Sequence, residues 1–223
     1  LANGVTVIEN AAREPEVVNL AEALRNMGCA IDGEGTTQIS IEGRKDLREL
    51  RIEIIPDRIE AATLIMAAAI TGGTLTLHGC RAEHLGAVLE KLAETHTRVE
   101  DHDGVLTIQG PDVIQPADVT TSPYPGFPTD LQAQIMALTC CADGDSVISE
   151  TIFENRLLHT AELRRMGADI RVDGHTAVVR GVSRLQGATV MATDLRASAC
   201  LVLAGLAAEG ATRVLRVYHL DRG

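Results

Sequence analysis

PDRIEAATLIMAAAITGGTLTL (residues 56–77) is one of three stretches that repeat a single pattern and so decide the fold. The other two are PTDLQAQIMALTCCADGDSVI (128–148) and ATDLRASACLVLAGLAAEGATRV (192–214). Each stretch has an acid near its start, continues as an almost unbroken apolar helix, and ends at a glycine-containing turn that leads into a strand. A helix that is apolar on every side must be buried on every side. We therefore predict that the three helices share one core in a repeat architecture.

A second pattern repeats between these stretches, at residues 14–43, 82–110 and 154–181. Each copy reads as an amphipathic helix, a strand, an Asp/Gly turn and a second strand that ends in glycine. The copies are spaced evenly, because Gly73 and Gly144 are 71 residues apart and Gly144 and Gly210 are 66 apart. The predicted repeating unit is a buried helix, a strand, an amphipathic helix and two further strands.

The two ends of the chain fall in the middle of this unit. Residues 4–10 form a strand without the buried helix that should come before it, and residues 217–223 lack the amphipathic helix that should follow. A repeat of this kind needs its neighbours to cover its apolar face. We therefore expect the chain to be part of a longer protein.

Composition excludes several classes of function. The chain has 223 residues, 45% of them hydrophobic and 2% aromatic, and a net charge of −11. Such a chain is not expected to bind nucleic acid or an anionic membrane. It shows no signal peptide and no long apolar span free of charges, so we predict a cytoplasmic protein. The cysteines and histidines lack metal-ligand spacing, so we expect neither a metal nor a cofactor.

Acids and arginines at equivalent turns are the candidates for chemistry. Asp130 and Asp194 occupy the same place in two repeats, where they either cap helices or help to bind a polar ligand. Arg156 stands at the predicted start of an amphipathic helix, and Arg196 one turn into an apolar helix, where it needs an anionic partner: Asp194 or a ligand. With Arg222 near the end of the chain, these arginines would suit a small substrate with two or three negative charges.

Six stretches of the chain, in order, resemble the family of UDP-N-acetylglucosamine enolpyruvyl transferases. They are ENAAREPE (9–16), IPDRIEA (55–61), FPTDLQAQ (127–134), ETIFENR (150–156), ATDLRASACLVLAG (192–205) and YHLDRG (218–223). The resemblance implies a mixed α/β fold, an inside-out α/β barrel built from βαβαββ repeats with helices inside and sheets outside. It also implies that residues 1–54 are the last part of one domain and residues 55–223 most of a second, with the active site between them.

The resemblance also implies an activity, the first committed step of peptidoglycan synthesis. The family moves the enolpyruvyl group of phosphoenolpyruvate to the 3-hydroxyl of UDP-N-acetylglucosamine by addition and elimination, and releases phosphate. By matching motifs, Asp130 is the base that meets the 3-hydroxyl, and Ile152 contacts the nucleotide sugar through its backbone. Arg196 and Arg222 hold phosphoenolpyruvate and its intermediate. Asp130 and Arg222 are the two residues expected to be catalytic, and Arg156 and Asp194 support the cluster.

Two departures from the family pattern matter. The family's catalytic cysteine, on a mobile loop, and its other phosphoenolpyruvate ligands would precede residue 1, so we expect the chain by itself to be inactive. The segment LAETHTRVE (92–100) also lacks the glycine that ends the helix in the sister repeats. Two alternatives stay open: 3-phosphoshikimate 1-carboxyvinyltransferase, and a non-catalytic binding or regulatory relative with the same fold.

Overall fold

The computed structural model describes residues 2–218, which fall into two compact units. The first unit comprises Leu1–Pro56 with Pro123–Pro125, and the second comprises Asp57–Ser122 with Gly126–Gly223. The assignment of residues 1–54 and 55–223 to two enolpyruvyl transferase domains stays a prediction.

The first unit contains one helix and one antiparallel sheet. Its elements are β1 (Val5–Glu9), α1 (Pro15–Asn26), β2 (Ala30–Asp32) and β3 (Gln38–Glu42), and the strands lie in the order β1–β3–β2. The helix buries Ala21 against Cys29, Ile31 and Ile39 of the sheet side. This arrangement is the predicted amphipathic helix followed by two strands.

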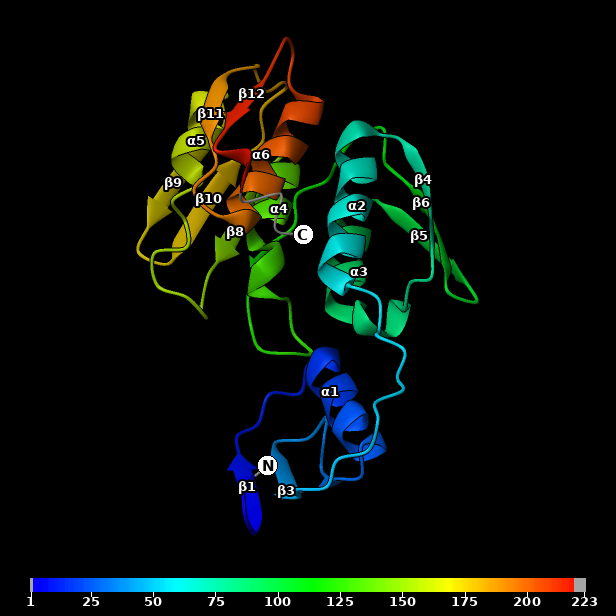
Figure 1. Ribbon diagram of the computed structural model, residues 1–223. Coiled ribbons are helices and arrows are strands. Elements are labelled where there is room, and N and C mark those ends of the chain that lie inside the picture. Colours follow the sequence, from blue (N-terminus) through cyan, green and yellow to red (C-terminus); the bar gives the residue numbers. More distant parts are fainter. Residues whose placement is uncertain (1, 219–223) are drawn as a thin grey trace. The chain divides into compact units, whose positions relative to one another are not determined.

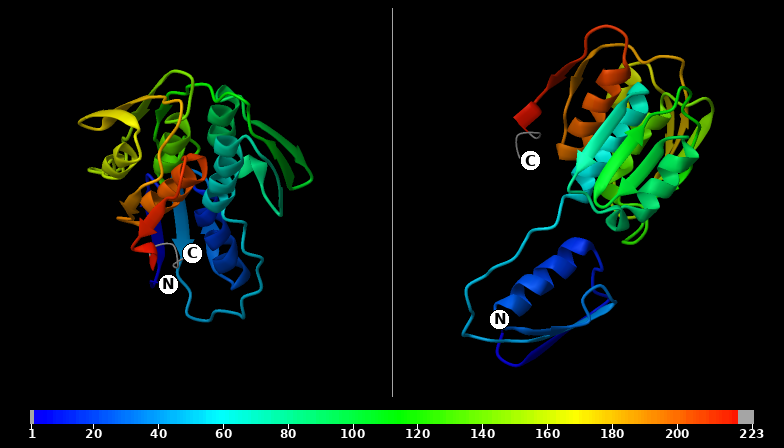
Figure 2. Two further views of the ribbon diagram at one scale, coloured as in Figure 1. Left: turned by 90° about the horizontal axis from the view of Figure 1, so that it is seen from above. Right: turned by 90° about the vertical axis from the view of Figure 1, so that its right-hand side faces the viewer.

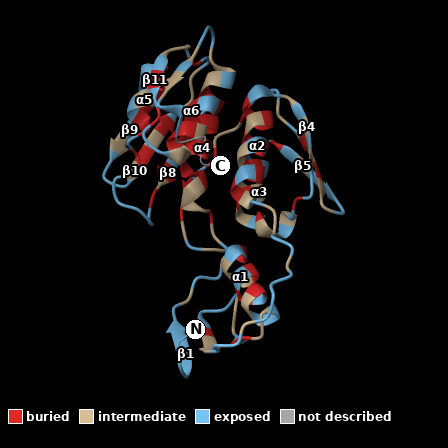
Figure 3. Cartoon of the chain, in the orientation of Figure 1, coloured by how far each residue is buried: buried red, intermediate tan, exposed pale blue. Residues whose placement is uncertain are grey.

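Three buried helices form the core of the second unit: α2 (Arg58–Thr71), α4 (Gln132–Thr139) and α6 (Leu195–Ala207). Each of them contacts the other two, and all eight residues of α4 are buried (Figure 3). The ends of α2, α4 and α6 meet at one pocket, which is lined by Gly72, Cys141 and Ala207. The helices therefore run in the same direction, and their starts lie together at the opposite end (Figure 1).

Strands cover these helices on the outside (Figures 1 and 2). One sheet has the order β4–β6–β5 and a second the order β7–β8–β10–β9, while β11 and β12 form a parallel pair. The bounds are β4 (Thr74–His78), β5 (Arg98–His102), β6 (Val105–Gln109), β7 (Val119–Thr120), β8 (Asp145–Ser149), β9 (Asp169–Asp173), β10 (Thr176–Arg180), β11 (Thr189–Met191) and β12 (Arg213–Leu215). The amphipathic helices are α3 (Gly86–Glu94) and α5 (Thr160–Arg165). The predicted order of helices inside and sheets outside is confirmed.

Two helices begin later than the sequence pattern indicates. The predicted amphipathic helix from residue 154 is wrong in its first turn, because residues 154–159 form turns and α5 begins at Thr160. Asn155 has a φ of 57°, which an α-helix does not allow. Helix α4 is preceded by the 3₁₀ helix η2 (Thr129–Leu131). Both irregular segments carry candidate site residues.

The second amphipathic helix, α3, ends without glycine, as its sequence indicates. Gly28 after α1 and Gly167 after α5 have φ values of 101° and 91°, and His96 stands at the equivalent place after α3 with a φ of 66°. The left-handed conformation of this turn is therefore kept, although a side chain is strained there.

No helix among residues 2–218 is both long enough and apolar enough to cross a membrane.

The glycines that end the strand pairs are required by close backbone approach. A β-carbon at Gly181 would lie 1.7 Å from the carbonyl oxygen of Ala142, and one at Gly110 would lie 2.3 Å from that of Ala68. The carbonyl of Ala68 lies in the last turn of α2, and that of Ala142 lies in the turn that follows α4. The repeated glycines therefore let the outer strand pairs pack against the ends of the core helices.

We predict that Gly181→Ala destabilises the protein, because the new methyl group overlaps a backbone carbonyl that cannot move freely. Overpacking of this kind costs typically about 1–3 kcal/mol or more. Gly86→Ala is the matched control, since a β-carbon at Gly86 has no neighbour within 4 Å. Urea unfolding followed by circular dichroism measures both variants. Equal stability of the two variants would contradict the packing argument.

Candidate functional site

Asp130 lies at the centre of a charged cluster at the start of the core helices. Its Oδ1 accepts a hydrogen bond from Nη2 of Arg156 at 2.8 Å, and its Oδ2 accepts one from Nη2 of Arg196 at 2.8 Å. Burial of the carboxyl group opposes its ionisation, but the hydrogen bonds and charges of Arg196 and Arg156 outweigh burial and lower the pKa of Asp130. The group is therefore a carboxylate at neutral pH.

The three repeated acids do not play the same role. Asp57 caps α2 through the N–H groups of Ile59 and Glu60, and Asp194 caps α6 through those of Arg196 and Ala197. Asp130 makes no capping bond, and the chain around it forms the 3₁₀ helix η2 instead of a first α-helical turn. The helix-cap interpretation thus holds for Asp194 and is wrong for Asp130.

Arg196 does not pair with the acid that its sequence position indicates. Its side chain binds Asp130, which lies 66 residues earlier in the chain, while Asp194 accepts a hydrogen bond from its backbone N–H at 2.9 Å. Asp194 or a ligand is the expected partner of the Arg196 side chain, and the partner in the structure is instead Asp130. By capping α6, Asp194 fixes the turn from which the guanidinium of Arg196 extends.

Arg156 reaches the same carboxylate from the turns that follow β8. Its Nη1 donates to Oγ1 of Thr129 at 2.7 Å, and its guanidinium carbon lies 4.8 Å from the centre of the Phe153 ring. Stacking of a guanidinium on an aromatic face restrains its plane. Arg156 is therefore held on three sides, by Asp130, Thr129 and Phe153.

Glu150, which our sequence analysis does not single out, lies behind this cluster. It is 2% exposed and follows directly after β8. Its carboxylate accepts hydrogen bonds from the hydroxyls of Thr121 and Thr129 and from two backbone N–H groups of the following turn. The sequence signal that could have drawn attention to Glu150 is its place as the first residue of ETIFENR (150–156). Its burial accounts for its many partners, since buried carboxylates are almost always paired.

His159 is a second residue that the sequence does not single out. It is 3% exposed, and among the described residues its Nε2 has no hydrogen-bond partner. Burial lowers the pKa of His159 to about 4, although the negative charge of Asp194 acts in the opposite direction. The imidazole is therefore neutral at pH 7 and adds no charge to the cluster.

The remaining candidates are placed as follows. Ile152 is 39% exposed, and its backbone N–H donates to Oε1 of Glu150 at 2.8 Å. Arg222 lies outside the described residues. The structure thus brings together Asp130, Arg156 and Arg196, with Asp194 and Ile152 on adjoining turns. Each guanidinium has five N–H donors, more than its bonds to Asp130 and Thr129 use, so both arginines can also donate hydrogen bonds to an anionic group.

Neither a thiol nor a metal centre adds to this chemistry in the described part of the chain. Burial raises the pKa of Cys141 to about 11, and it also raises the pKa values of Cys140 and Cys200. Such thiols stay protonated and unreactive at neutral pH. Within residues 2–218, no group of three or more His, Cys, Asp or Glu side chains is placed to hold a metal ion.

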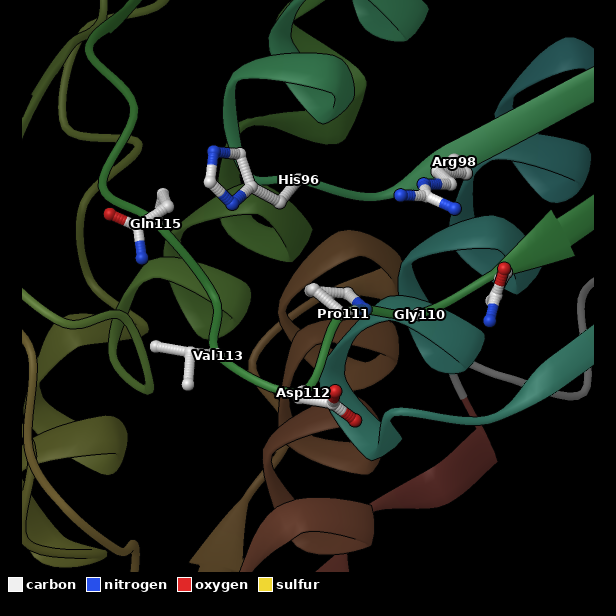
Figure 4. A pocket seen from close by; sticks show the side chains of 8 residues that line it. His96, Arg98, Gly110, Pro111, Asp112, Val113 and Gln115 are labelled. Carbon is white, nitrogen blue, oxygen red and sulfur yellow. The ribbon is translucent and has the colours of Figure 1, made fainter.

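Two pockets of the second unit differ in their relation to the cluster. One of about 420 Å³ is lined by residues that include His96, Arg98 and Asp112 (Figure 4), and it contains no member of the cluster. A smaller pocket of about 180 Å³ has Glu150 and Arg156 in its wall. Of these two pockets, only the smaller one includes a member of the cluster, Arg156, while Asp130 and Arg196 line neither of them.

Comparison of sequences identifies relatives over the whole chain. The pattern of the EPSP synthase family (3-phosphoshikimate 1-carboxyvinyltransferase) matches residues 1–223. The UDP-N-acetylglucosamine 1-carboxyvinyltransferase of Geobacter metallireducens is 55% identical over 223 residues, which are 100% of this chain and 54% of that protein. The protein of the same name from Nitratidesulfovibrio vulgaris is 58% identical over 224 residues, 54% of its length. The chain therefore spans about half the length of the curated relatives it matches.

Solved structures of enolpyruvyl transferases resemble the chain over its whole length. The enolpyruvyl transferase NikO from Streptomyces tendae superposes with a TM-score of 0.90 at 28% identity, covering 100% of this chain and 53% of that one. An EPSP synthase from Acinetobacter baumannii superposes with a TM-score of 0.72 at 21% identity, covering 99% and 54%, and supports the fold alone. The predicted enolpyruvyl transferase fold and the predicted resemblance are confirmed, and the chain belongs to the EPSP synthase family of enolpyruvyl transferases.

Proposed function

We propose that this chain provides one part of the active site of a UDP-N-acetylglucosamine 1-carboxyvinyltransferase. That enzyme moves the enolpyruvyl group of phosphoenolpyruvate to the 3-hydroxyl of UDP-N-acetylglucosamine and releases phosphate, which begins peptidoglycan synthesis. The observation that carries the proposal is identity of 55% along the whole chain to a protein of that name. The cluster of Asp130 with two arginines supports it, because both substrates are anionic.

Asp130 is the proposed base. As the oxygen of the 3-hydroxyl adds to C2 of phosphoenolpyruvate, its proton passes to the Asp130 carboxylate, and an acid from outside this chain protonates C3. The resulting tetrahedral intermediate then loses a proton from C3 and its phosphate group, which restores the double bond. General-base catalysis needs an ionised group within hydrogen-bond reach of the proton, and Asp130 is ionised and partly exposed.

The two arginines make Asp130 a weak base in the arrangement that the structure shows, since each hydrogen bond favours its charged form. The phosphate and carboxylate groups of phosphoenolpyruvate would compete for the same guanidiniums. Every hydrogen bond that moves from Asp130 to phosphoenolpyruvate raises the pKa of Asp130 and strengthens it as a base. Binding of the anionic substrate would thus activate the group that takes the proton.

The other site residues have supporting roles in the proposal. The N–H of Ile152 already donates to Glu150, so a backbone contact with the nucleotide sugar would use the carbonyl oxygen of Ile152. Arg196 and Arg222 would hold phosphoenolpyruvate and its intermediate, and Asp194 would keep Arg196 in place. Both substrates are small molecules of the cytoplasm, where we place the protein.

The second candidate acceptor is 3-phosphoshikimate. It has support from the family name and from the EPSP synthase structures, but those structures are only 20–21% identical to this chain. A non-catalytic relative with the same fold is the third possibility. Activity with each acceptor separates these three cases.

We predict that a full-length hybrid, in which this chain replaces the matching part of the Geobacter metallireducens protein, releases phosphate from phosphoenolpyruvate only when UDP-N-acetylglucosamine is present. Turnover should be on the order of 10 per second, which is typical of enzymes. A coupled phosphate assay measures it. The 223-residue chain alone should release none, because the family's acid lies outside it. Turnover with 3-phosphoshikimate as the acceptor would reject the proposal, and so would a lack of turnover with either acceptor.

Asp130→Asn in this hybrid should reduce turnover by about 10²- to 10⁴-fold, because loss of a general base has this effect. The melting temperature should fall by only a few degrees, since the ion pairs of Asp130 are partly exposed. Asp57→Asn is the control, because Asp57 only caps α2 and asparagine caps about as well. An Asp130→Asn enzyme with normal turnover would remove Asp130 from the mechanism.

A further inference from the structure

We propose that Glu150 is a positioning residue that holds Thr129, and through it Arg156, against the Asp130 carboxylate. The effect of Glu150 on catalysis rests on the proposed function, whereas its effect on the position of Arg156 follows from the hydrogen bonds alone. Four hydrogen bonds and one relay through a hydroxyl group carry it.

Glu150 joins three segments of the second unit. Its Oε2 accepts from the hydroxyl of Thr129 in η2 at 2.8 Å. Its Oε1 accepts from the hydroxyl of Thr121, next to β7, at 2.9 Å, and from the N–H groups of Ile152 and Phe153 at 2.8 and 3.1 Å. One buried carboxylate therefore ties the loop that carries Asp130 to the turn that carries Arg156.

The relay depends on the direction of one hydroxyl group. A threonine hydroxyl has a single hydrogen, and that of Thr129 points to Glu150. Its lone pairs then face Nη1 of Arg156, which lies 2.7 Å away and can only donate. Glu150 thus fixes Thr129 as an acceptor for Arg156.

Glu150 acts on Arg156 by a second route. It holds the N–H of Phe153, and the ring of the same residue stacks on the Arg156 guanidinium. In the described part of the chain, the Glu150 carboxylate bonds neither to Asp130 nor to a cation. Its role is to orient the groups that do.

The competing explanation is that Glu150 only satisfies buried donors and so stabilises the fold. Its two threonine partners separate the explanations. Both hydroxyls donate to the same carboxylate, but only that of Thr129 also contacts Arg156. Thr129→Val and Thr121→Val each remove one hydrogen bond to Glu150 and one bond that the hydroxyl accepts, from Arg156 and from the N–H of Thr151 respectively, and only the first breaks the relay. Thr129→Ser keeps the hydroxyl and serves as the rescue variant.

The first readout is the titration of the Asp130 carboxyl group, followed by ¹³C NMR in the 223-residue chain. Among residues 2–218, the charged groups that face Asp130 are Arg156, from the turns after β8, and Arg196, from α6. Loss of the Thr129 hydroxyl frees Arg156, so Thr129→Val should raise the pKa of Asp130 by roughly 0.5 or more. Thr121→Val and Thr129→Ser should leave it unchanged. An unchanged pKa in Thr129→Val, or an equal rise in Thr121→Val, would overturn the proposal.

The second readout is turnover of the full-length hybrid. Thr129→Val should lower kcat about tenfold, as expected when a catalytic group loses its orientation, and Thr129→Ser should restore most of it. Thr121→Val should lower kcat less than Thr129→Val does, even where the two variants lower the melting temperature equally. Equal losses of kcat in the two valine variants would show a purely structural role. If the unmodified hybrid is inactive, the proposed function fails, while the NMR titration still decides the inference about Glu150.

Discussion

The burial of three helices that are apolar on every side is the constraint on which the second unit depends. Helices α2, α4 and α6 can leave water only by packing against one another and under sheets. Their parallel course puts the three starts together, and with them the acids of the three repeats. The charged cluster is therefore a consequence of how the apolar core assembles.

Equivalent positions in the repeats have diverged within this shared frame. Asp57 and Asp194 keep the capping role that their helix starts require. Asp130 has lost it, because the chain before α4 folds into η2 and turns the carboxylate toward Arg156 and Arg196. A short difference in backbone conformation thus separates two acids that cap helices from one whose carboxylate faces two arginines. The repeat supplies the position, and the local departure from the repeat supplies the site.

The sequence predicts the periodic part of the structure well. The apolar helices and the strand pairs follow from spacing and from their glycine ends, and the structure confirms them. The contact between Asp130 and Arg196 cannot be predicted from the sequence pattern, because it joins two repeats and depends on how the starts of their helices meet. The late start of α5 and the bonds of Glu150 depend on irregular turns, which have no periodicity to read. The proposed roles of the site residues therefore rest on the resemblance, and the structure shows the contacts between these residues.

The parallel course of the core helices has a thermodynamic consequence. Helix dipoles that lie side by side in the same direction repel one another, whereas those of an antiparallel bundle attract. An anion that binds near the positive ends of the helices and the guanidiniums reduces the repulsion between these positive charges. Binding at this end is therefore linked to folding, and a saturating ligand stabilises the native state in proportion to the logarithm of its concentration. The melting curve of the protein thus serves as a direct reporter of site occupancy, even under conditions where no turnover takes place.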